Sequence, residues 1–279
     1  MPVYYSKYPW YVHAENERQY LQVTRFKDSS FHSVGKRDWT PDEVDFEMSF
    51  GKDPTQLEIF WFTQECLEYF VSRYPKTYEH LYFNNATMIR DWSPLADLPN
   101  LKGVSIHWCR ADRLWDMSRN TKLTNLYLNT TKKIACNLSD LQTCPSIENV
   151  FISGDMDTSY RIPSLSCFAD LPNLRRIDLT NIKVEDHDLS FLKSLPSLEE
   201  FHFDPGMLTT EEITYICANY PNLYGRSLGA YTTYDYKSLN DIRICGYRKP
   251  GLNLPEQQAR FDKYVAEFNA LLEKYKEKQ

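Results

Sequence analysis

Long apolar runs are missing from the start of this 279-residue sequence. The opening stretch, MPVYYSKYPWYVHAENERQY, has no apolar core of the kind found in signal peptides. The nearest apolar run, residues 59–62, is far too short to cross a bilayer. We therefore expect a soluble protein of the cytoplasm that does not use a membrane as its partner.

Cysteine is present without any recognisable spacing. The seven cysteines are odd in number and scattered, and no CxxC pair occurs. Neither a disulfide framework nor a zinc knuckle is indicated, so we expect free and mostly buried thiols and no metal cofactor. Enzyme signatures are also missing: the chain has no GxSxG, Walker loop, GxGxxG after a strand or HExxH. We expect no cofactor and no catalytic activity.

The charge balance is mildly acidic. The chain carries 32 basic and 38 acidic residues, a formal net charge of -6. Basic pairs such as Lys132-Lys133 are isolated in the sequence and are typical of ordinary surface. Nucleic acid is therefore not an expected partner. With 42% hydrophobic and 15% aromatic residues, the chain can bury a substantial core without help.

A repeated pattern of apolar residues dominates the middle of the chain. Five Leu-x-x-Leu-x-Leu units begin 22, 24, 27 and 24 residues apart, and most follow a proline that ends the preceding segment. Their anchors are Leu101/Val104/Ile106, Leu123/Leu126/Leu128, Ile147/Val150/Ile152, Leu174/Ile177/Leu179 and Leu198/Phe201/Phe203. Weaker copies are Tyr78/Leu81/Phe83, Leu223/Arg226/Leu228 and Leu239/Ile242/Ile244. About eight short strands are predicted.

These units resemble the leucine-rich-repeat superfamily, and segments such as DWSPLADL (residues 91–98) are similar to the turns of internalin-type bacterial repeats. The resemblance covers roughly residues 78–247 and implies an α/β solenoid with a parallel sheet. It departs from the family at the ninth motif position, where asparagine or cysteine is usual. Cys109 fits, but Thr131 and Asp155 do not. We therefore expect no asparagine ladder.

The ends of a solenoid need covers, and the flanking sequences predict them. Residues 1–77 are interpreted as an N-terminal cap, with strand-like alternation at 20–26 and 44–48 and a helix that opens at Pro54. Its predicted apolar face contains Leu57, Phe60, Trp61, Leu67, Phe70, Val71 and Tyr74. Residues 248–279 are interpreted as a C-terminal capping helix that opens at Pro255.

The residues between the anchors should point away from the core, because side chains alternate along a strand. This concave face is the predicted protein-binding site, since aromatic and arginine side chains dominate binding hot spots. Its candidate residues are Tyr82, His107, Trp108, Tyr127, Phe151, Arg176, Asp178, Glu200 and His202. The alternative is simple cross-strand packing, with Arg175 or Arg176 paired with Glu199 or Glu200 on the next strand.

The leading functional hypothesis is a non-catalytic protein of bacterial type that binds a protein or peptide partner, which the sequence does not identify. A toxin-neutralising immunity or inhibitor protein is a narrower form of it. An enzyme with an unrecognised site in the N-terminal region and a self-associating scaffold are the other two alternatives. We expect a monomer.

Overall fold

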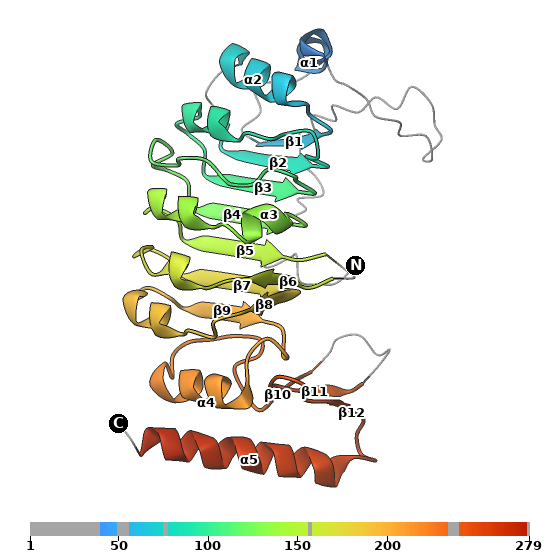
Figure 1. Ribbon diagram of the computed structural model, residues 1–279, viewed down its shortest axis with the longest axis vertical. Coiled ribbons are helices and arrows are strands. Elements are labelled where there is room, and N and C mark those ends of the chain that lie inside the picture. The colour runs from blue at the N-terminus through green and yellow to red at the C-terminus, as the bar shows by residue number, and fades with distance from the viewer. Residues whose placement is uncertain (1–39, 49–55, 75–77, 156–157, 234–239, 278–279) are drawn as a thin grey trace. The chain divides into compact units, whose positions relative to one another are not determined.

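The computed structural model describes residues 40–48, 56–74, 78–155, 158–233 and 240–277. The main sheet has seven strands in the order β1-β2-β3-β4-β5-β7-β9, with strand numbers following the chain (Figure 1). Two compact units divide the chain, Met1–Asn149 and Val150–Gln279. Each unit is described separately.

The first unit contains four parallel strands and the segments that connect them. Its elements in chain order are α1 (Pro41–Met48), β1 (Gln56–Phe60), α2 (Gln64–Arg73), β2 (His80–Asn84), η2 (Ser93–Asp97), β3 (Gly103–His107), β4 (Asn125–Asn129), α3 (Lys132–Ala135) and η3 (Ser139–Thr143). Each strand pairs with the next in parallel register. The anchors Val104, Ile106, Leu126 and Leu128 are fully buried, so the predicted register is confirmed here.

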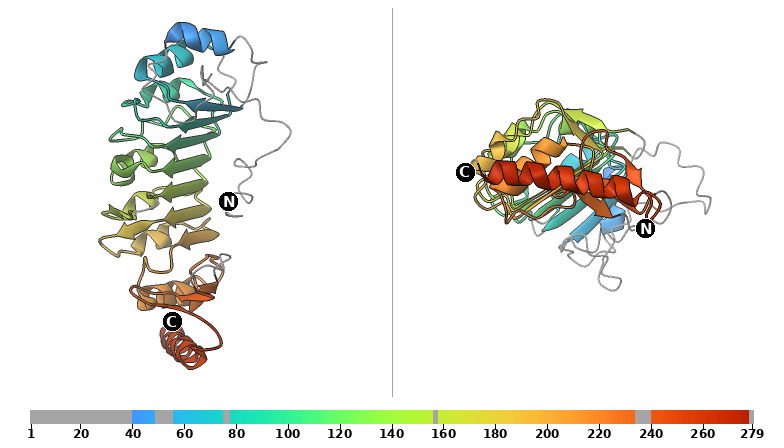
Figure 2. Two further views of the ribbon diagram at one scale, coloured as in Figure 1. Left: turned by 90° about the vertical axis from the view of Figure 1, so that its right-hand side faces the viewer. Right: turned by 90° about the horizontal axis from the view of Figure 1, so that it is seen from below.

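The second unit begins within β5 and continues the repeat before the pattern changes. Its elements are β5 (Asn149–Ser153), β6 (Tyr160–Ile162), η4 (Ser166–Phe168), β7 (Arg176–Thr180), β8 (Ile182–Val184), η5 (Ser190–Ser194), β9 (Glu200–Phe203), α4 (Thr210–Asn219), β10 (Tyr231–Thr233), β11 (Ile242–Ile244), β12 (Gly251–Leu252) and α5 (Gln258–Lys276). Strands β7 and β9 pair in parallel over buried anchors such as Ile177 and Phe201. The short 3-10 turns return the chain to each next strand, as Figure 2 shows from the side. The protein has the predicted α/β leucine-rich-repeat solenoid fold.

A residue in the left-handed backbone region follows most of the sheet strands. These residues, with φ between 52° and 63°, are Trp61, Asn85, Trp108, Thr130 and Asn181. In this bend the parallel hydrogen-bond ladder continues: the amide of Trp108 donates to the carbonyl of Asn129 at 3.0 Å. Asparagine tolerates this conformation, whereas tryptophan adopts it at a cost in free energy.

The ninth motif position turns back into the core. Cys109 is buried there, and its sulfur accepts hydrogen bonds from the indole N–H of Trp92 at 3.4 Å and the amide of Ala111 at 3.2 Å. In the next coil Thr131 is fully buried and its hydroxyl has no hydrogen-bond partner. The two coils therefore differ at this position: the Cys109 sulfur is hydrogen-bonded, and the Thr131 hydroxyl is not.

Two N-terminal predictions are wrong. Residues 44–48, expected as a strand, lie in α1, because Thr40 and Glu43 form a reciprocal cap: the amide of Thr40 donates to the Glu43 carboxylate at 3.0 Å. The helix expected from Pro54 does not include Leu57 or Phe60, which lie in β1. The helix α2 begins only after Thr63, whose side chain caps it. The strand expected at 20–26 lies outside the described residues.

The prediction of parallel strands at Leu223/Arg226/Leu228 and Leu239/Ile242/Ile244 is also wrong. Around Arg226 the chain makes only an isolated bridge, Glu200 to Tyr224, and no strand. A side chain at Gly225 would lie 2.0 Å from the carbonyl oxygen of Phe201, so this close approach to β9 requires glycine. The strand predicted at 239–244 is β11, but it pairs antiparallel with β10 and β12. The unequal spacing of 16 residues after Leu223 reflects this change.

The C-terminal helix α5 packs against α4 within the second unit. The rings of Tyr215 and Tyr275 meet edge to face at 6.0 Å, and Phe268 is buried. Phe261 packs against the core of the antiparallel sheet and contacts Tyr231 at 4.9 Å. The predicted helix exists, but most of its apolar stripe is only half-buried. The division into residues 1–77, 78–247 and 248–279 stays a prediction.

Candidate functional site

The side of the sheet opposite the core, which we call the sheet face, carries the predicted site residues. In β3, Val104 and Ile106 point into the core, so Ser105 and His107 point the other way. Parallel register aligns Tyr82, Ser105 and Tyr127 in one column of the first unit. In the second unit, Asp178 aligns with His202. Strand alternation thus predicted the columns correctly.

Three rings form an aromatic stack on the sheet face of the first unit: Tyr82, His107 and Tyr127. The imidazole of His107 lies 4.9 Å from the Tyr127 ring at 18°, and 4.6 Å from the Tyr82 ring. Its Nδ1 is 3.2 Å from the Tyr82 hydroxyl, and its Nε2 is 3.0 Å from the Ser105 hydroxyl. His107 and Tyr127 are buried, while Tyr82 is partly exposed.

Burial lowers the pKa of His107 to about 3. No charge offsets the lost hydration of the imidazolium, so the neutral ring is strongly favoured. Both ring nitrogens instead meet hydroxyls, which can donate or accept hydrogen bonds as the neutral ring requires. His107 therefore acts here as a neutral, positioned aromatic group, without the charge change that makes histidine a pH sensor near neutrality.

Trp108 ends the same strand and differs from the stack in its exposure. Its side chain is 47% exposed and its φ is 52°. The ring meets His107 edge to face at a centroid distance of 6.2 Å. It is the only exposed large apolar side chain among the described residues of the first unit.

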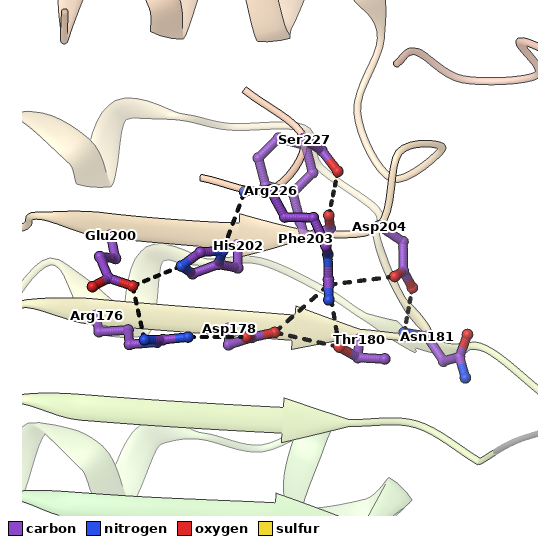
Figure 3. Close-up of polar contacts among 10 residues, drawn as sticks. All are labelled: Arg176, Asp178, Thr180, Asn181, Glu200, His202, Phe203, Asp204, Arg226 and Ser227. Atoms are coloured by element: carbon purple, nitrogen blue, oxygen red, sulfur yellow. Dashed lines mark hydrogen bonds and ion pairs between the residues drawn. The ribbon is translucent and has the colours of Figure 1, made fainter. Parts of the chain in front are cut away.

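The second unit presents a charged network instead of rings (Figure 3). Its members are Arg176, Asp178, Glu200, His202, Asp204 and Arg226. Arg176 contacts Glu200 at 2.8 Å and Asp178 at 3.7 Å. Asp178 is buried on β7, with the guanidinium of Arg226 at 3.8 Å on its other side.

His202 is held in one tautomer by its two partners. Its Nδ1 accepts the backbone N–H of Arg226 at 3.1 Å, so Nε2 carries the proton and donates to Glu200 at 2.8 Å. Burial lowers the pKa of His202, and the hydrogen bond that its Nε2 donates to Glu200 only partly opposes this effect. The ring therefore links β9 to the segment that follows α4.

Asp204 closes the network at the end of β9. One carboxylate oxygen accepts the backbone N–H of Asn181 at 2.6 Å, and the other lies 3.5 Å from Arg226. Burial raises the pKa of Asp204, while the Asn181 hydrogen bond and Arg226 lower it. The side chain thus binds the left-handed turn after β7 to the chain beyond α4.

Sequence reasoning placed some network members correctly and missed others. Arg226 was assigned to a core anchor, whereas it lies on the sheet face; an arginine at an apolar position is the signal that could have shown this. Arg175 and Glu199 form an exposed pair at 2.6 Å, as the cross-strand packing alternative predicted. Phe151 is buried in the second unit. A binding role for the nine candidates stays a prediction.

The described residues contain no group of three or more histidine, cysteine, aspartate or glutamate side chains placed to hold a metal ion. Among the same residues, no helix combines the length and apolarity needed to cross a membrane. Cys66, Cys109, Cys144 and Cys245 are buried as expected, but Cys136 is exposed.

No known family profile matches the sequence, and no curated protein sequence matches it. Solved structures do show similarity. Internalin C2 from Listeria monocytogenes aligns with a TM-score of 0.45 and 19% identity over 57% of this chain and 65% of its own. Internalin F from the same organism gives 0.37 and 19%, over 67% and 62%.

The TLR13–ssRNA13 complex gives a TM-score of 0.45 and 13% identity over 67% of this chain and 30% of TLR13. This chain spans less than two thirds of each of these three proteins. At such identities the likeness concerns the fold alone.

Proposed function

We propose that this chain is a non-catalytic protein-binding module whose partner contacts the sheet face. The observation that carries this proposal is the charged network of the second unit. Its buried members, Asp178 and His202, hold the side chains of Arg176, Glu200 and Arg226 in fixed positions. Those three are partly exposed, with 18%, 35% and 18% of their side-chain surfaces accessible.

Fixed charges suit recognition because binding then costs little side-chain entropy. A guanidinium held by carboxylates keeps its planar donors in a defined direction, which favours one orientation of a partner. The aromatic stack offers a parallel arrangement in the first unit, where His107 and Tyr127 position the exposed edge of Tyr82. In both units the buried residues would hold the partly exposed residues in place. The partly exposed residues would contact the partner.

Quantitative affinity capture from the source cell, followed by mass spectrometry, tests this proposal. The bait variants are Glu200→Gln, which removes charge at constant side-chain length, and Arg176→Gln, which replaces the guanidinium with a shorter neutral amide. Lys193→Gln is the matched control, because Lys193 is exposed on η5, away from the strands. We expect a specific partner that is retained by the control and lost by the two sheet-face variants. Equal capture by all baits would contradict binding at this face.

A further inference from the structure

We infer that the first unit carries a second interaction surface, which recognises an acidic segment of a protein partner. This surface, the Trp108 ridge, consists of Arg90, Trp108, Arg110 and Lys132. It lies in the turns that leave the strands, beside the sheet face and not on it. The inference rests on the proposed function only in assuming a protein partner.

Trp108 is the anchor of the ridge because folding does not explain it. Equivalent turns use asparagine at residues 85 and 181, which adopts the left-handed conformation readily, and the smaller threonine at residue 130. Trp61 shares the conformation but is more buried than Trp108, which leaves 47% of its surface in solvent. A strained tryptophan that leaves 47% of its surface exposed recovers only part of this cost through burial. Such an outlier indicates a functional requirement, and tryptophan is prominent among binding hot spots.

Three cations lie in the turns that follow β2, β3 and β4, in the coil of Trp108 and the coils on either side of it. Cys109 points into the core, so its neighbours Trp108 and Arg110 are both exposed. The guanidinium of Arg90, from the preceding coil, donates to the carbonyl of Arg110 at 3.3 Å. In the following coil, Thr131 is buried like Cys109, and Lys132 is exposed in the position equivalent to Arg110.

The cations of the ridge form no ion pair with the residues that the structure describes. Within the described part of the chain, Arg90, Arg110 and Lys132 have no carboxylate oxygen within 4.0 Å. Nearby carboxylates are already engaged: Asp112 pairs with Lys133 at 2.6 Å, and Asp91 accepts hydrogen bonds from Ser93. These cations are therefore available to a partner.

Charge complementarity selects the partner. The turn segments 85–92, 108–113 and 130–136 contain five basic and two acidic residues, and Asp140, which pairs with Arg113 at 2.5 Å, reduces their formal charge to +2 in a chain of -6. A local positive strip attracts an acidic segment while the rest of the surface repels a long polyanion. Nucleic-acid binding would need cations that follow many phosphates, and three free cations beside one exposed ring do not form such a track. The occupant is an acidic peptide segment that places an apolar side chain on Trp108.

Selection from a displayed random-peptide library on the whole chain tests the ridge. We expect enriched peptides to carry Asp or Glu around an apolar or aromatic residue. A synthetic copy of the best peptide should bind Trp108→Asn and the double variant Arg110→Glu/Lys132→Glu about tenfold or more weakly than wild type. Lys274→Glu, a charge reversal at an exposed lysine of α5, should leave the affinity unchanged.

The folding control is thermal melting. Trp108→Asn should melt no lower than wild type, because asparagine suits the left-handed turn, so loss of binding cannot come from unfolding. Three results would contradict the proposed role of the Trp108 ridge. They are failure to enrich any peptide, enrichment of neutral or basic peptides, and equal binding by all variants. If a single-stranded oligothymidine bound more tightly than the peptide and this binding was lost in the same variants, the ligand of the ridge would be nucleic acid and not a peptide. If the partner captured from cells is lost by the sheet-face variants, the proposed function stands even when the ridge fails.

Discussion

The aromatic stack and the charged network occupy equivalent positions on the strands of the two units, yet they are built from opposite chemistry. One packs neutral rings around His107, and the other links carboxylates and guanidiniums around Asp178. Both keep a histidine neutral, His107 by burial alone and His202 by burial together with an amide that donates to its Nδ1. Strand geometry decides which positions face away from the core, while the residues at those positions decide how the face responds to salt, acid and partners.

The cores beneath the two faces should behave alike. Leu126 and Ile177 are both fully buried anchors. We expect Leu126→Ala and Ile177→Ala each to lower the free energy of unfolding by about 3 kcal/mol, through lost burial and the cavity that remains. Chemical denaturation measures both. A loss below about 1 kcal/mol for either variant would contradict the strand register in that unit.

The faces themselves should differ in their electrostatic stability. Asp178→Asn leaves two guanidiniums without their shared buried carboxylate, and we expect a loss of about 3 kcal/mol that shrinks in high salt. Tyr127→Phe removes only a hydroxyl that accepts a hydrogen bond from Asn129 at 3.2 Å, a loss of about 1 kcal/mol that salt does not change. Equal losses with the same salt dependence would remove the contrast between the two faces.

Acid should lower the free energy of unfolding through His107 of the aromatic stack. The pKa of His107 is about 3 in the folded chain, below the 6.5 of an unperturbed imidazole, so the unfolded chain takes up the proton first. The contribution of the neutral His107 ring to the free energy of unfolding is therefore fully present above pH 6.5 and is lost as the pH falls toward 3. At pH 5 the loss reaches about 2 kcal/mol. His107→Gln should flatten the decline of unfolding free energy between pH 7 and 4, and an unchanged pH profile would contradict this assignment.

A smaller effect on the free energy of unfolding is expected at Thr131, which occupies the ninth motif position. Thr131→Val replaces a buried hydroxyl without a hydrogen-bond partner by a methyl group of the same size, and should stabilise the first unit by about 1 kcal/mol. Thr143→Val is the control, because the Thr143 hydroxyl donates to Asp140 at 2.7 Å and accepts the amide of Met117. It should destabilise the chain. Stabilisation by both variants, or by neither, would show that burial of the hydroxyl is not the cause.

Much of the fold could be predicted from the sequence because the anchors repeat with a strand period between prolines. The errors fell where two signals competed. Residues 56–60 fit a helical face and a strand equally well, and only five residues were available to decide. At Arg226 the repeat spacing outweighed the residue type. In α1, the cap formed by Thr40 and Glu43 overrode an alternation that had indicated a strand.

The sheet face was predictable because alternation needs no knowledge of distant contacts. The Trp108 ridge was not, since Arg90, Arg110 and Lys132 lie more than a full repeat apart from end to end in the sequence, and stacking of successive coils groups them. Lys132-Lys133 looked isolated in the sequence for this reason. The left-handed turn at Trp108 also depends on the strand it follows, and no local motif announces it.

Oxidative footprinting of the chain with its captured partner tests the central claim most directly, that the partner binds on the strand side of the repeats. The informative probes are exposed aromatic rings: Trp108 beside the sheet face of the first unit, and Tyr224, which bridges to Glu200 in the second. Tyr231 and Tyr247, exposed near the C-terminal antiparallel sheet, are the internal controls. We predict that the complex protects Tyr224, whose ring contacts His202 of the charged network, while the controls keep their reactivity; protection of Trp108 alone would indicate the Trp108 ridge instead. Protection confined to Tyr231 and Tyr247 would contradict the account.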